Sequence, residues 1–137
     1  DRVLTDTYTT ERDLVAARDA RLDAIDSQLQ LSKDIIESSA EKVKKTEQLI
    51  ESLKASGKMV PEATYAKLER EKLQLATQKG VQEGHRIKRE EVIEQFDSYI
   101  ERFRELMAEK QKRRAAYEKR RADKARAEQG MPPLGHN

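Results

Sequence analysis

The sequence predicts an all-α fold: a long antiparallel two-helix coiled-coil hairpin with a basic single-helix C-terminal extension. Three observations lead to it. Aliphatic residues repeat every seven positions in the first half of the chain, Gly57 and Pro61 interrupt the pattern, and basic residues crowd toward the C-terminal end. The composition agrees, because 39% of the residues are charged and the chain has no Trp and only two Phe. That leaves too few bulky side chains for a compact globule.

The first helix is predicted over residues 10–56, after an extended N-terminal segment at residues 1–9 that shows no helical periodicity. Thr10 suits the N-cap, because Asp13 follows at the spacing of a capping box, with Asp in place of the usual Glu. Every seventh residue from position 15 is aliphatic, which keeps one stripe of a supercoiled helix against its partner. These expected core residues are Val15, Leu22, Leu29, Ile36, Val43 and Ile50.

A companion stripe, three residues further along, is apolar only toward its ends. Ile25 and Leu53 are expected to join the core, whereas the residues between them are the small polar Ser32, Ser39 and Thr46. The first helix should end at Gly57, since glycine adopts the positive φ that follows many helix ends. A tip at residues 57–60 and a second helix that starts at Pro61 complete the expected hairpin, because proline is tolerated in a first turn.

The hairpin part of the second helix is predicted over residues 61–108, within a hairpin domain of residues 10–108. Its expected core residues are Leu68, Leu75, Ile93, Phe96, Ile100, Phe103 and Met107. If the chain folds back near residue 59, large residues face large ones and small residues face small ones. We therefore expect a close helix crossing at Ser39, Ala76, Gly80 and Gly84. A bend or a break at the two glycines is the alternative, because each costs about 1 kcal/mol relative to Ala within a helix.

Residues 109–129 are predicted to form a basic helical extension. Residues 110–126 hold nine basic and two acidic side chains, so this segment carries +7 while the rest of the chain, within a total of +2, carries −5. The expected contact surface is Lys110, Lys112, Arg113, Arg114, Lys119, Arg120, Arg121, Lys124 and Arg126. Three readings stay open: a solvated or partner-contacting helix, contact with an anionic membrane or cell-wall surface, and nucleic-acid binding. Tyr117 is the one aromatic residue there, so base stacking is not provided for, although phosphate attraction needs only charge.

Residues 130–137 should not be helical, because Gly130 and the Pro132-Pro133 pair oppose it. They form either a flexible C-terminal tail or a peptide ligand for another surface. We expect no enzymatic activity, metal or cofactor. His85 and His136 are the two histidines, and neither has a partner at metal-binding spacing. Cysteine is absent, which excludes disulfides, and no apolar run approaches the roughly 20 residues that span a bilayer.

The opening DRVLTDTYTTERDLVAARDARLDAID resembles a family of uncharacterised Gram-negative periplasmic or envelope coiled-coil proteins. The similar positions are Asp1, Arg2, Leu4, Thr7, Tyr8, Asp13, Ala17, Arg18, Asp19, Arg21 and Leu22, and IERFRELM at residues 100–107 resembles the family's second helix. The resemblance covers most of residues 1–108. It implies a helical hairpin after a signal peptide and a small N-terminal domain of unknown function, both expected upstream of Asp1. No reaction is assigned to the family, and the basic extension and tail match nothing in it.

The function expected from the pattern and the resemblance is structural: a coiled-coil spacer or accessory subunit of a bacterial envelope assembly, periplasmic or envelope-associated. A lone two-helix hairpin buries little apolar surface, so we expect protein partners on its helix faces, through homo-oligomerisation or as a subunit of a larger assembly. The alternative is a cytoplasmic adapter whose basic helix binds nucleic acid or an acidic partner.

Overall fold

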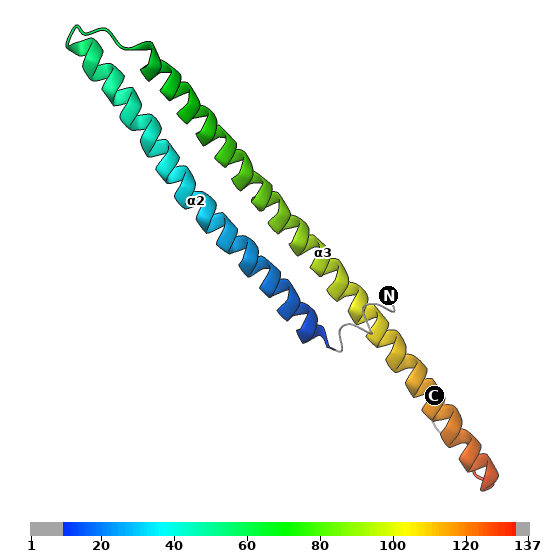
Figure 1. The fold of residues 1–137 in the computed structure, drawn as a ribbon. Coiled ribbons are helices and arrows are strands. Elements are labelled where there is room, and N and C mark those ends of the chain that lie inside the picture. The colour runs from blue at the N-terminus through cyan, green and yellow to red at the C-terminus, as the bar shows by residue number, and fades with distance from the viewer. Residues whose placement is uncertain (1–9, 134–137) are drawn as a thin grey trace. The chain divides into compact units, whose positions relative to one another are not determined.

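The chain folds as a helical hairpin of two long helices (Figure 1). The structure is a computed structural model that describes residues 10–133. Helix α2 spans Glu11–Ala55 and helix α3 spans Glu62–Glu128. The segment expected at residues 1–9 and the last part of the expected tail, residues 134–137, lie outside the described residues.

Helix α2 begins with the predicted capping box. The backbone N–H of Asp13 donates to Thr10 Oγ1, and the backbone N–H of Thr10 donates to Asp13 Oδ2, each at 3.2 Å. Two N–H groups that the helix itself cannot satisfy are therefore bonded, one at each residue of the box. The prediction from the Thr10–Asp13 spacing is confirmed.

Helix α2 ends at a glycine in the left-handed conformation. Gly57 has a φ of 68°; its N–H donates to the Lys54 carbonyl and the N–H of Lys58 donates to the Leu53 carbonyl. This pair of bonds is a Schellman motif. Gly57 thus ends α2 as expected, although the last helical residue is Ala55 rather than residue 56, and α3 begins at Glu62 rather than at Pro61. Pro61 stands just before the helix, where its carbonyl accepts from the N–H of Thr64.

The same motif closes α3. Gly130 has a φ of 73°, its N–H donates to the Ala127 carbonyl, and the N–H of Met131 donates to the Arg126 carbonyl. Arg126 also donates from Nε to the carbonyl of Pro132 at 2.6 Å, which holds the first residues after the helix against its last turn. Glycine can adopt this conformation without the steric cost that a Cβ adds.

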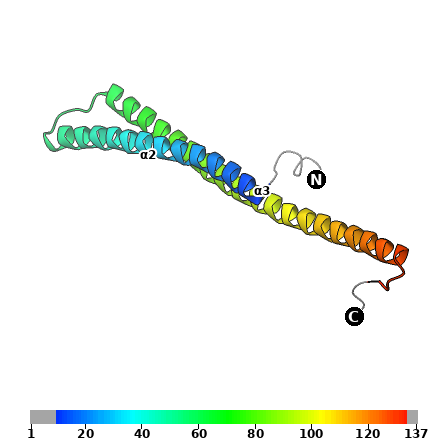
Figure 2. The same ribbon diagram turned by 90° about the horizontal axis from the view of Figure 1, so that it is seen from below.

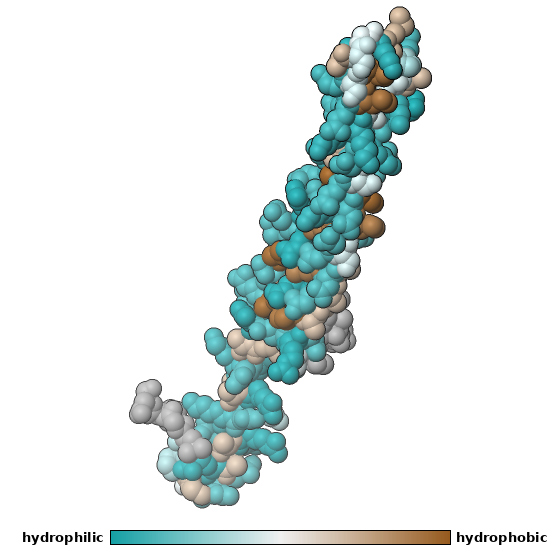
Figure 3. Space-filling view, turned by 90° about the vertical axis from the view of Figure 1, so that its left-hand side faces the viewer, coloured by the Kyte–Doolittle hydropathy of each residue, from teal (hydrophilic) through white to brown (hydrophobic). Residues whose placement is uncertain are grey.

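Contacts along the hairpin divide it into two units, which we describe separately. The tip unit comprises residues 18–94, and the end unit comprises the described residues 10–17 and 95–133. Figures 1 and 2 show α2 and α3 side by side in the tip unit, joined at the Gly57 end. Surface side chains are largely hydrophilic, with apolar ones showing between them (Figure 3).

The core of the tip unit is small and sits near the tip. Val43, Ile50 and Leu68 form a buried cluster against which Val60 and Leu75 pack. From Ile25 to Thr46 of α2, one buried stripe recurs every seven positions, and its other three members, Ser32, Ser39 and Thr46, are polar. Thr46 donates from Oγ1 to Glu71 Oε1 at 2.5 Å, and Arg89 Nε contacts Asp26 Oδ1 at 2.8 Å. The interface between the helices is thus partly polar.

The opposing stripe of α3 has the same character. Buried or half-buried residues follow one another at intervals of three and four from Leu68 to Val92, as Leu68, Glu71, Leu75, Gln78, Gln82, His85, Arg89 and Val92. The polar residues of this stripe, together with Ser32, Ser39 and Thr46 of α2, are called the polar seam; those of α3 are Glu71, Gln78, Gln82, His85 and Arg89. All their buried side-chain polar atoms have hydrogen-bond partners among the described residues.

The end unit holds the larger side chains. Leu14, Phe96, Ile100 and Phe103 are buried, and the rings of Phe96 and Tyr99 meet edge to face with centroids 5.5 Å apart. Arg104 of α3 donates from Nε to Glu11 Oε1, an ion pair that joins the first turn of α2 to α3. Leu14 is fully buried, although its place beside the aliphatic stripe suggests partial exposure.

The core residues expected from the sequence are all buried or half-buried. Seven are buried: Ile25, Val43, Ile50, Leu68, Phe96, Ile100 and Phe103. Eight are half-buried: Val15, Leu22, Leu29, Ile36, Leu53, Leu75, Ile93 and Met107. Val92, at 1% exposure, is the most buried residue of the tip unit and was not expected in the core.

The expected close crossing is wrong. Ser39 is buried, but Ala76, Gly80 and Gly84 are exposed, and a Cβ built on either glycine would meet nothing within 4 Å. The physical reason is helical phase, since the three-and-four spacing that runs from Leu68 to Val92 passes through Gln78, Gln82 and His85 instead. Helix α3 continues through both glycines, so neither one breaks it.

Candidate functional site

The candidate functional site is the basic part of α3 in the end unit, residues 109–128. Every residue from 108 to 121 is exposed, so about four helical turns have no residue buried. Eight of the nine expected basic residues are exposed: Lys110, Lys112, Arg113, Arg114, Lys119, Arg120, Arg121 and Lys124. Arg126 is half-buried and holds the Pro132 carbonyl. The segment therefore presents its cationic side chains to solvent.

Local hydrogen bonds and ion pairs occupy part of this charge. Arg113 Nη2 lies 2.5 Å from Glu109 Oε1, and Arg114 Nε lies 3.4 Å from Glu118 Oε1. Both pairs join residues four apart on an exposed helix surface, where each contributes roughly 0.3–0.5 kcal/mol. Arg120 Nε donates to the Ala116 carbonyl at 3.4 Å. These contacts support the helix and are weak enough for a partner to replace.

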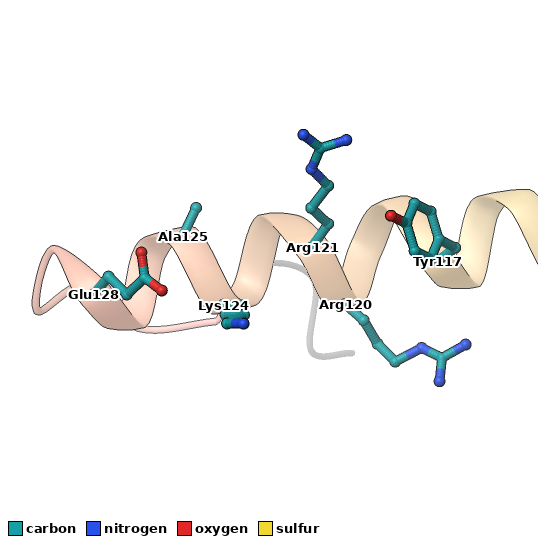
Figure 4. Close-up of a pocket in the computed structure, with 6 residues that line it drawn as sticks. All are labelled: Tyr117, Arg120, Arg121, Lys124, Ala125 and Glu128. Atoms are coloured by element: carbon teal, nitrogen blue, oxygen red, sulfur yellow. The ribbon is translucent and has the colours of Figure 1, made fainter.

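The cationic side chains do not converge. An open depression on the helix surface is lined by Tyr117, Arg120, Arg121, Lys124, Ala125 and Glu128. Figure 4 shows Arg120 and Arg121 pointing to opposite sides of the helix, with Lys124 pointing in a third direction. A small ligand needs several groups aimed at one point. The arrangement instead suits a partner that lies along the helix and meets charge on more than one side.

Three groups outside the basic segment have shifted pKa values, each through an ion pair between the helices. The hydrogen bond from Arg104 holds the pKa of Glu11 below its ordinary value, and the same contact raises the pKa of Arg104. Asp26 likewise raises the pKa of Arg89. The groups are solvent-exposed, and the shifts follow from structural ion pairing, so they mark no acid–base centre.

The described part of the chain shows no other candidate centre. Among residues 10–133, no three His, Asp or Glu side chains come together in a way that could hold a metal ion. Within the same range, neither helix contains an apolar stretch that is long enough to cross a membrane. His85 lies half-buried in the polar seam.

Sequence reasoning missed how deeply the polar seam is buried. Ser32, Ser39 and Thr46 are 4%, 4% and 5% exposed, yet as small polar residues they read as a weak part of the stripe. The signal was their spacing of seven, in phase with Ile25 and Leu53.

Comparison of this chain with protein-family models, with curated proteins and with solved structures found no match.

Proposed function

We propose that this protein is a non-enzymatic interaction protein, an antiparallel coiled-coil hairpin that presents a basic single helix to a partner within a larger assembly. The contacts Glu11–Arg104, Asp26–Arg89 and Thr46–Glu71 support the antiparallel register, because earlier residues of α2 meet later residues of α3. The seven-residue spacing of buried positions supports the coiled coil.

The single observation that carries the proposal is the exposed helix at residues 108–121. Tertiary packing supplies most of the stability of helices in proteins, and this segment has none among the described residues. The segment is helical because it continues α3 and because ion pairs within it, such as Glu109–Arg113, support the helix. A long charged helix held in this way loses little conformational entropy when a partner binds it, which favours association.

An acidic protein surface is the partner we favour for this helix. Residues 110–126 carry a surplus of positive charge, whereas the rest of the chain is net negative, so the positive potential is concentrated on one segment. The resemblance over residues 1–108 supports a place in a bacterial envelope assembly, with the hairpin as spacer or accessory subunit.

Nucleic-acid binding is the second candidate, and the charge density of the same segment favours it. A protein that neutralises many phosphates loses affinity steeply as salt rises. Two observations argue against nucleic-acid binding. Arg120 and Arg121 point in different directions, and Tyr117 is the one aromatic side chain of the basic segment that could stack on a base.

Site-specific cross-linking in the native cell tests the favoured function. A photoreactive residue at Tyr117 should give one defined protein adduct, and the same residue at Tyr65 near the tip should not. The adduct should disappear when Arg120, Arg121 and Lys124 are changed to Gln. It should persist when the exposed Lys44, Lys54 and Lys79 are changed to Gln, which removes equal charge elsewhere.

Two results would contradict the proposal. One is the absence of any protein adduct at Tyr117. The other is tight binding of duplex DNA at physiological salt with a steep salt dependence, which would favour the nucleic-acid function. Fractionation of the full-length protein with protease protection tests the envelope location separately, and a cytoplasmic location would contradict it.

A further inference from the structure

One side of the tip unit carries no acidic residue over residues 24–52 of α2 and 67–88 of α3. The contacts Asp26–Arg89 and Thr46–Glu71 fix the register between the helices. A residue of α2 and a residue of α3 lie at the same height along the hairpin when both are equally far in sequence from about residue 58. In this register Ile35 of α2 lies at the height of Val81 of α3. Both stand on the same flank of the polar seam, because each is one position before a core residue in the seven-residue repeat.

We call this side the acid-free face and define its centre by Leu31, Ile35, Thr77, Val81 and Gly84. The helical repeat places residues 24, 28, 31, 35, 38, 42, 45, 49 and 52 of α2 and 67, 70, 74, 77, 81, 84 and 88 of α3 on it. None of these is Asp or Glu, and five are basic: Lys42, Lys45, Lys67, Arg70 and Lys88. The face ends where Lys88 contacts Glu91 at 3.9 Å.

The opposite side of the tip unit carries both signs of charge, with acidic residues in excess. The same repeat places Asp19, Asp23, Asp26, Glu37, Glu47, Glu51, Glu69, Glu83 and Glu90 there, together with Lys33, Lys44, Lys54, Lys72, Lys79 and Arg86. The absence of acidic residues is therefore a property of one side of the hairpin and not of its composition, since both signs are common on each helix. A surface that excludes one sign of charge over this length discriminates among partners.

The centre of the acid-free face is apolar and open. Leu31 is 61% exposed and Val81 is 43% exposed, whereas Ile35 is half-buried between the helices. A Cβ at Gly84 would meet nothing within 4 Å, so a large side chain from a partner has room to enter beside Val81. The face thus has an apolar centre, with Lys42, Lys45, Lys67 and Arg70 on its tip side and Lys88 at its other end.

We propose that the acid-free face docks an acidic amphipathic helix of a partner protein, which then forms the third helix of a bundle. A helix fits because two packed helices leave a groove that accepts the apolar stripe of a third. Acidic residues on that helix fit because Lys42, Lys45, Lys67 and Arg70 lie on the same face, between its apolar centre and the tip. A second copy of this chain that docks through its own acid-free face does not fit, because that face is basic.

This inference rests on the proposed interaction function and adds a second surface with its own partner chemistry. The probe is a labelled synthetic helical peptide of about 21 residues, roughly 30 Å long. It has a Leu stripe on one face and Glu on both flanks. A control peptide keeps the Leu stripe and has Lys in place of Glu. Binding to the full chain is measured by fluorescence anisotropy at physiological salt.

We expect the Glu-flanked peptide to bind at least about tenfold more tightly than the Lys-flanked one. Leu31→Glu and Val81→Glu, each checked for helicity by circular dichroism, should each weaken binding by about tenfold or more. Tyr65→Glu is the matched control, because Tyr65 is 41% exposed and lies on the other side of α3. It should leave the affinity within about twofold.

The basic helix needs its own control, because it also attracts an acidic peptide. Changing Arg120, Arg121 and Lys124 to Gln should leave the affinity nearly unchanged. If that variant alone loses binding, the proposed docking face is wrong and the basic helix stands as the contact surface. Failure of cross-linking at Tyr117 with peptide binding intact would reject the basic helix and keep the face. Equal affinity for the two peptides, no binding, or insensitivity to Leu31→Glu would overturn the inference.

Discussion

At the residue scale, ion pairs connect the two helices at a few points. Arg104 bonds Glu11 in the end unit, and Arg89 bonds Asp26 in the tip unit. All four side chains are partly exposed to solvent, so each pair contributes little to the free energy of unfolding. Their main effect is on register, because a shift of one helix along the other would separate the charges.

The Glu11–Arg104 pair predicts a pH dependence. The pKa of Glu11 is lowered in the folded protein, so the pair stabilises the fold above the ordinary pKa of 4.5 and this contribution is lost as pH falls through the lowered value. Glu11→Gln should therefore lower the midpoint of thermal unfolding at about pH 7 and have little effect near pH 2.5.

Thermal melts followed by circular dichroism at both pH values measure this difference. Glu105→Gln is the control, because Glu105 pairs with Arg102 on the same helix and should show a smaller difference. An equal loss at both pH values would mean that Glu11 acts through helix formation rather than through its charge.

Phe96 should be the most sensitive single position of the end unit. Its ring is 3% exposed and meets the ring of Tyr99. Phe96→Ala should cost about 3–5 kcal/mol, because it removes buried apolar surface and leaves a cavity. Leu73→Ala, at a side chain 69% exposed, should cost under about 0.5 kcal/mol. Urea unfolding compares the two, and similar midpoints would show that Phe96 is not packed as described.

At the element scale, glycine has opposite roles along the two helices. Gly57 and Gly130 have positive φ and end α2 and α3, whereas Gly80 and Gly84 lie inside α3 with open space around them. Gly57 and Gly130 adopt a left-handed backbone conformation that other residues adopt only at a cost in free energy. Gly80 and Gly84 have ordinary helical backbone, so the helix does not need glycine at either position.

Substitution by alanine should separate these roles. Gly80→Ala should raise the free energy of unfolding by about 1 kcal/mol, because Ala is the better helix former and its methyl group meets nothing. Gly57→Ala should lower it by roughly 1–2 kcal/mol, because a Cβ is strained at that φ. Chemical denaturation of both variants gives the two signs, and a destabilised Gly80→Ala would restore the close crossing.

Helix ends and the aliphatic stripe could be predicted from the sequence because their causes are local. Thr10 with Asp13 and Gly57 each carry a signal within a few residues. The polar seam and the exposed glycines depend on which side of α3 meets α2. That phase was readable by extending the three-and-four spacing back from Phe96 to Leu68. Pairing small residues with small residues obscured it, because the buried positions in between are Gln and His.

At the scale of the whole molecule, charge is distributed in two patterns that the total of +2 hides. Positive charge accumulates along residues 110–126, and within the tip unit the acid-free face carries basic residues and no acidic ones. The sequence predicted the first pattern, because a run of Lys and Arg is visible directly. The second pattern could not be seen without the register between α2 and α3, because that register places residues such as Ile35 and Val81 at the same height on one side of the hairpin.

Amide hydrogen exchange should show a gradient of protection along α3. Amides near Leu68, where Val43 and Ile50 pack, should exchange only through opening of the hairpin. Those at residues 108–121 should exchange faster, because no tertiary contact among the described residues holds them. Mass spectrometry of peptic fragments resolves the two regions, and equal protection would mean that the basic helix is covered in the free protein.

The seven-residue spacing of the polar seam also makes the length of the hairpin a quantity that can change in steps. Removing seven residues from α2 and seven from α3 at the same height would return Ser32, Ser39 and Thr46 to equivalent neighbours, with the reach shortened by about 10 Å. Removing them from one helix alone would offset every contact beyond that point. Insertions and deletions in such a protein are therefore expected to occur as matched pairs of heptads, which would keep the contacts between the helices while the length of the hairpin changes.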